Sequence, residues 1–119
     1  MITTLLLVDD DASFRALATD ILREIGVESI VEADTAAAAV DRALVVRPQA
    51  ALVDVGLPDR DGIELARELA ALPWAPAIVL TSADCDVGAG IAHDHDGTPP
   101  FVPKDELLNV PLRQMLRLE

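Results

Sequence analysis

The stretch AALVDVGLPDRDG, residues 50–62, decides how the rest of the chain is interpreted. Its first four residues are apolar, as in a strand that is buried on both faces, and Asp54 ends this run. The LPDRDG that follows has the proline and glycine content of a loop. Ligands bind outside the carboxyl ends of strands in open α/β sheets, so Asp54 is a candidate for chemistry. Taken alone, a carboxylate that caps the next turn explains Asp54 equally well.

Strand and helix patterns alternate along the rest of the chain. Apolar runs predict strands at residues 5–8, 27–33, 77–80 and 101–102. Helical spacing of apolar residues predicts helices over residues 14–25, 35–46 and 63–72, and a last helix that carries Leu112, Met115 and Leu116. Between residues 83 and 100 only Val87 and Ile91 keep this spacing, so a fourth helix there is expected to be short or weak. The alternation predicts an α/β fold with a doubly wound, five-stranded parallel sheet.

Capping residues and apolar faces give these helices further detail. Asp11 or Ser13 is expected to begin the first helix, and Asp34 or Thr35 the second. Asn109 is expected to cap the last helix, with Pro111 in its first turn. The residues that the second helix is expected to bury are Ala36, Val40, Ala43 and Leu44.

Composition limits the classes of function. At 119 residues, 51% of them apolar, the chain is long enough for one domain with a real core. A formal net charge of -12 argues against direct binding to nucleic acid. The N-terminal residues lack a basic region and run into three carboxylates, so neither a signal peptide nor a membrane span is predicted, and a cytoplasmic protein is expected. The single cysteine, Cys85, excludes an internal disulfide and fits a reducing compartment.

Polar side chains end four of the predicted strands. Asp9 and Asp10 follow the first strand, Asp54 the third, Thr81 the fourth and Lys104 the fifth. Carboxylates held close together repel one another unless a cation joins them, and an all-oxygen site of this kind suits Mg²⁺. A carboxylate can accept a phosphoryl group, and Mg²⁺, the Lys104 ammonium and the Thr81 hydroxyl would each bind one phosphoryl oxygen.

The segments LLLVDDD, LVDVGLPDRDG, IVLTSAD and FVPK, in this order, resemble the receiver domain of two-component response regulators, of the single-domain chemotaxis type. The resemblance spans nearly the whole chain and implies a flavodoxin-like sheet with strand order 2-1-3-4-5. Residues 1–119 are accordingly expected to form the receiver alone, with no output domain. One departure is that Asp105 follows Lys104, where the family usually has proline.

The resemblance also implies a role for each matching residue. Asp54 corresponds to the phosphoacceptor, and Asp9, Asp10, Asp54 and the main-chain carbonyl of Gly56 to the Mg²⁺ ligands. Thr81 resembles the switch hydroxyl, Lys104 the phosphate-binding lysine and Phe101 the switch aromatic. The implied partners are a sensor histidine kinase or histidine phosphotransfer protein, an output protein and, after phosphorylation, a second copy of the chain. Such a protein is a switch that catalyses only its own phosphorylation and dephosphorylation.

Two other functions compete with the receiver interpretation. The DDD after LLLV also resembles the opening of haloacid-dehalogenase-type phosphohydrolases, with Asp9 as the nucleophile. That interpretation leaves Asp54 and LPDRDG unexplained and needs a cap that the chain is too short to supply. A phosphorylation-independent interaction module is disfavoured because no site residue is missing. His93 and His95 are interpreted as solvated side chains rather than metal ligands.

Overall fold

A computed structural model of the protein describes residues 3–83 and 99–118. Its five strands form one parallel sheet in the order β2-β1-β3-β4-β5, which confirms the predicted topology. In chain order the strands are β1 (Thr4–Val8), β2 (Ser29–Ala33), β3 (Ala50–Asp54), β4 (Ala77–Ser82) and β5 (Phe101–Pro103).

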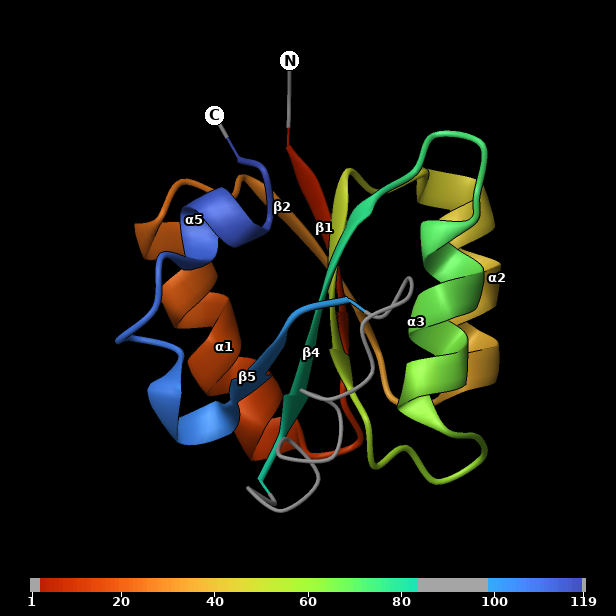
Figure 1. Ribbon diagram of the computed structural model, residues 1–119, viewed down its shortest axis with the longest axis horizontal. Coiled ribbons are helices and arrows are strands. Elements are labelled where there is room, and N and C mark those ends of the chain that lie inside the picture. Colours follow the sequence, from red (N-terminus) through yellow and green to blue (C-terminus); the bar gives the residue numbers. More distant parts are fainter. Residues whose placement is uncertain (1–2, 84–98, 119) are drawn as a thin grey trace.

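Helices cover both faces of this sheet (Figure 1). The described α-helices are α1 (Ala12–Glu24), α2 (Ala36–Val46), α3 (Gly62–Ala70) and α5 (Leu112–Met115), and a single 3₁₀ turn, η1, spans Lys104–Glu106. Helices α1 and α5 lie on one face, and α2 and α3 lie on the other. Most of the weak fourth helix that the sequence suggested falls on residues 84–98, outside the described ranges.

The core consists of two apolar layers, one on each side of the sheet. Leu5 and Leu7 point into the layer beneath α1 and α5, whereas Leu6 and Val8 point into the layer beneath α2 and α3. Successive side chains of a strand alternate between its two faces, so a strand covered on both sides must be apolar throughout. This explains why β1 and β3 are continuous apolar runs in the sequence.

The structure decides between the alternative caps of the first two helices. The Asp11 side chain accepts a hydrogen bond from the Ser13 main-chain N–H at 2.9 Å and begins α1. The Thr35 hydroxyl accepts one from the Ala38 N–H at 3.1 Å and begins α2. Each cap satisfies a main-chain donor that has no partner within its own helix.

Three detailed expectations, for Leu44, Asn109 and Pro111, are wrong. Leu44 is 58% exposed, because α2 rests on the sheet through Ala36, Ala39 and Ala43, and Leu44 lies about 100° around the helix from Ala43. Asn109 does not cap the last helix, which begins at Leu112 after a non-helical Pro111, too far along for Asn109 to reach. The Asn109 amide instead donates to the Glu106 carboxylate at 3.0 Å.

Candidate phosphoacceptor and metal site

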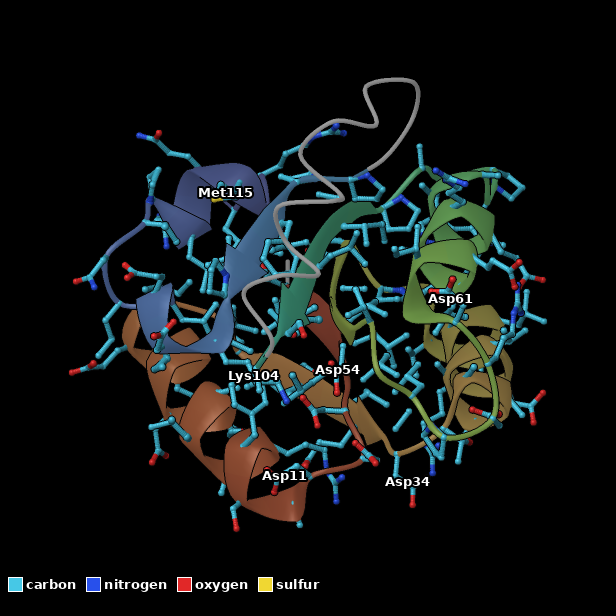
Figure 2. All side chains as sticks on the ribbon, turned by 60° about the horizontal axis from the view of Figure 1, so that its bottom comes forward. Asp11, Asp34, Asp54, Asp61, Lys104 and Met115 are labelled. Carbon is cyan, nitrogen blue, oxygen red and sulfur yellow. The ribbon has the colours of Figure 1, made fainter. Side chains whose placement is uncertain are left out.

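Parallel strands bring their carboxyl ends to one edge of the sheet, and the polar residues predicted from the sequence gather there. Asp9 directly follows β1, Asp54 is the last residue of β3, and Lys104 directly follows β5. Figure 2 shows the Lys104 and Asp54 side chains pointing toward one another from these strands. Thr81, in β4, is the register partner of Asp54 and is 1% exposed.

Three carboxylates form the acidic part of this site. One oxygen each from Asp9, Asp10 and Asp54 lie within 4.8 Å of one another, the only such group among the residues that the structure describes. Asp9 is fully buried and Asp54 is 6% exposed, while Asp10 faces solvent. Burying a carboxylate is costly unless a positive charge accompanies it. The cluster therefore has the donor type and the charge to hold a divalent cation with oxygen ligands.

Lys104 supplies a positive charge in direct contact with the cluster. Its Nζ atom lies 2.7 Å from Asp9 Oδ2 and 3.5 Å from Asp54 Oδ2. The contact with Asp9 Oδ2 is an ion pair without the geometry of a regular hydrogen bond. The same nitrogen lies 4.4 Å from the centre of the Phe14 ring. One ammonium thus faces two buried carboxylates, which leaves negative charge at the site.

The pKa shifts reflect this imbalance. Burial raises the pKa of Asp9, and the negative charge of Asp54 adds to the rise, against the opposing effects of Lys104 and the Asp11 N–H. Burial lowers the pKa of Lys104, but the nearby Asp9 and Asp54 carboxylates outweigh it, so that this pKa is raised. Lys104 therefore stays protonated at neutral pH, and a bound cation would relieve the cost of an ionised Asp9.

Main-chain contacts fix the loops that carry these side chains. The Asp11 N–H donates to Asp9 Oδ1 at 2.8 Å, and the Gly56 N–H donates to Asp54 Oδ1 at 3.1 Å. The Arg15 guanidinium donates to the Asp9 main-chain carbonyl at 2.6 Å and to Glu32 at 2.9 Å. Since the contacts of the Asp11 N–H, the Gly56 N–H and the Asp9 carbonyl restrict the chain beside a carboxylate, the cluster is held in place before any ligand binds.

The sequence also predicted two residues outside the charged cluster, Phe101 and Gly56. Phe101 is half-buried and packs on the apolar layer beneath α2 and α3, and β4 separates its strand, β5, from β3. Gly56 lies two residues past Asp54, in the loop that leads to α3. Sequence reasoning missed Phe14, which served only as an apolar position of the helix predicted over residues 14–25, and Arg15. Neither forms a recognisable motif with residues near it in the sequence.

Comparison with known proteins decides the family. The model of the response regulator receiver domain matches residues 5–108. The chain belongs to this family. The resemblance of the four motifs is thereby confirmed, and the receiver is a phosphoacceptor switch of two-component signalling rather than a classical enzyme. The comparisons do not favour the haloacid-dehalogenase interpretation.

Curated relatives of the receiver include two mycobacterial regulators. The chain is 39% identical over 77 residues to the transcriptional regulatory protein PdtaR of Mycobacterium tuberculosis, a match covering 65% of the chain and 38% of PdtaR. It is 36% identical over 114 residues to the DNA-binding response regulator MtrA of Mycolicibacterium paratuberculosis, covering 92% of the chain and 50% of MtrA. The receiver therefore spans half or less of the length of these relatives.

Solved structures show the same architecture. A putative response regulator from Chloroflexus aurantiacus superimposes with a TM-score of 0.79 at 27% identity, covering 98% of this chain and 99% of that one. Chemotaxis response regulator CheY4 of Vibrio cholerae gives a TM-score of 0.73 at 20% identity, covering 98% and 100%, and shows the fold alone. No helix in the described part of the receiver is both long and apolar enough to cross a membrane.

Proposed function

We propose that Asp54 is the phosphoacceptor of this receiver and takes the phosphoryl group from a phosphohistidine of a sensor kinase or phosphotransfer protein. A carboxylate oxygen of Asp54 attacks the phosphorus atom, the bond between phosphorus and the histidine nitrogen breaks, and an acyl phosphate forms. The observation that carries the proposal is the place of Asp54, which lies 3.5 Å from the Lys104 ammonium and within 4.8 Å of the two other carboxylates of the cluster.

Mg²⁺ fits the donor set of this site. Asp9, Asp10 and Asp54 would bind it through carboxylate oxygens, and Gly56 through its main-chain carbonyl, with water completing the six oxygen ligands that Mg²⁺ prefers. Bound there, Mg²⁺ would neutralise charge on the transferred phosphoryl group.

Side chains of the protein bind the remaining phosphoryl oxygens. The Lys104 ammonium pairs with one of them and the Thr81 hydroxyl donates to another, since Thr81 lies in β4, which is next to β3, and Lys104 directly follows β5, which is next to β4. Moving the Thr81 hydroxyl toward the phosphoryl group would change the packing around half-buried Phe101, on the neighbouring strand. This couples phosphorylation to the surface that the output partner contacts.

Mass spectrometry after treatment with acetyl phosphate and Mg²⁺ tests this assignment. We expect one phosphoryl group on the wild-type protein and none on Asp54→Asn. Asp34→Asn is the matched control, because Asp34 is an exposed acid at the same edge of the sheet. Its side chain points away from the cluster (Figure 2). Normal phosphorylation of Asp54→Asn would refute the proposal, and phosphorylation at Asp9 would revive the haloacid-dehalogenase interpretation.

A further inference from the structure

The wall of the site that lies against Lys104 is aromatic. Phe14, in the first turn of α1, is 7% exposed and belongs to the apolar layer beneath α1 and α5. Its ring centre lies 4.4 Å from Lys104 Nζ, and the Lys104 side chain is only 16% exposed. An ammonium within about 6 Å of an aromatic face is attracted by the electron density of the ring, most strongly where water is excluded.

This attraction differs in kind from the two ion pairs of Lys104. The Asp9 carboxylate, 2.7 Å away, belongs to the proposed Mg²⁺ ligands, and a carboxylate that binds a cation attracts a lysine less strongly. The Asp54 carboxylate, 3.5 Å away, becomes an acyl phosphate in the proposed reaction. Both anionic partners therefore change during the switch, whereas the Phe14 ring offers the same attraction before and after it.

We infer that Phe14 is a positioning residue, whose ring face holds the Lys104 ammonium beside Asp54 so that it meets the incoming phosphoryl oxygen. The inference rests on the proposed function and adds a residue to it. The Lys104 side chain has four rotatable bonds. If its ammonium group is already held in place, less conformational entropy is lost when the phosphoryl group binds. A neutral ring suits this task because it holds the ammonium without competing for Mg²⁺ and without repelling a phosphoryl group.

Replacing Phe14 with cyclohexylalanine isolates the effect of the ring face, since this residue keeps an apolar six-membered ring of similar size and lacks the π electrons. Ile21→Val is the matched control, because Ile21 is a buried residue of the same helix and the same apolar layer. Lys104 is the only lysine of the chain, so lysine labelled at its ε-carbon gives a side-chain NMR signal from this residue alone.

Two quantities are read from this signal. The first is the position of the Lys104 ε-proton resonance without ligand, which the ring current shifts upfield when the ammonium lies over the ring. The second is the affinity for beryllofluoride, a phosphoryl analogue, in the presence of Mg²⁺. We expect the cyclohexylalanine protein to lose the upfield shift and to bind beryllofluoride about three- to twentyfold more weakly than the wild type. Ile21→Val should retain both properties.

The outcomes separate this inference from the proposed function. Wild-type affinity and an unchanged shift in the cyclohexylalanine protein would overturn the role of Phe14 and leave the proposed function standing. Equal weakening in Ile21→Val would also overturn it, because the effect would then come from lost packing. A wild-type protein that binds no beryllofluoride would overturn the proposed function itself, and with it any part that Phe14 plays in phosphoryl binding.

Discussion

Gly62, the first residue of α3, shows how closely the main chain is packed at the site. A Cβ atom added to Gly62 would lie 2.1 Å from the Asp54 carbonyl oxygen and 2.6 Å from Val55 Cα. Both neighbours are main-chain atoms, which cannot rotate away as a side chain can. We expect Gly62→Ala to lower the free energy of unfolding by about 1–3 kcal/mol, as overpacking does, although alanine favours a helix over glycine by about 0.5–1 kcal/mol. Urea denaturation measures the change.

Gly56→Ala is the control for this prediction. A Cβ atom on Gly56 would meet only Asp54 Oδ1, at 3.8 Å, which is ordinary van der Waals contact. Its free energy of unfolding should stay within about 0.5 kcal/mol of the wild type, as for most surface substitutions. Equal stability of the two variants would show that the start of α3 can move away from β3 at little cost.

At the scale of elements, the loop after β3 is tied to the start of α2. The Asp59 carboxylate accepts hydrogen bonds from the Ala36 N–H at 2.9 Å and the Ala37 N–H at 3.1 Å, and these bonds lower the pKa of Asp59. A lowered pKa in the folded state means that the stabilisation is present above the ordinary pKa of 3.8 and is lost as the pH falls through the folded value. We expect Asp59→Asn to lower the thermal midpoint at pH 7, and the difference from the wild type to shrink in acid.

Asp34→Asn separates this tether from a general effect of charge. Asp34 is an exposed acid just before α2, and its replacement leaves both Asp59 bonds in place. Its thermal midpoint should follow that of the wild type at neutral pH. A difference between Asp59→Asn and the wild type that stays constant down to pH 2 would contradict an ionised Asp59 as the source of the stabilisation.

The elements that the sequence predicted well are those whose signal is local. β1 and β3 are continuous apolar runs because both faces of each strand are covered. Asp54 could be singled out because it ends the second of these runs. The tether between Asp59 and α2 joins residues more than twenty positions apart, and its existence depends on how the loop folds. The contact of Lys104 with Phe14 is similarly remote in sequence. The prediction that Leu44 is buried was wrong for another reason. A stripe of alanines lets α2 lie close to the sheet, and this leaves the neighbouring Leu44 exposed.

Charge is the property of the whole molecule that bears most on function. The chain has a formal net charge of -12, and three of its carboxylates meet within 4.8 Å at one edge of the sheet. Asp9 and Asp54 are 45 positions apart in the sequence, so the three carboxylates come together only when the chain folds. A divalent cation that needs all three ligands therefore binds the folded state and not the unfolded one, and its binding free energy adds to the stability of the fold.

Mg²⁺ should accordingly raise the thermal midpoint of this receiver, by the equivalent of about 2.7 kcal/mol when its concentration is a hundred times the dissociation constant. Asp10→Ala should abolish the rise at little cost to the apo protein, because Asp10 faces solvent and yet contributes an oxygen to the cluster. Differential scanning calorimetry at constant ionic strength measures both effects, since added salt alone screens the repulsion within so acidic a chain. Asp34→Ala removes an equal charge from the same edge of the sheet and should keep the full response to Mg²⁺. An unchanged response in Asp10→Ala would place the cation elsewhere.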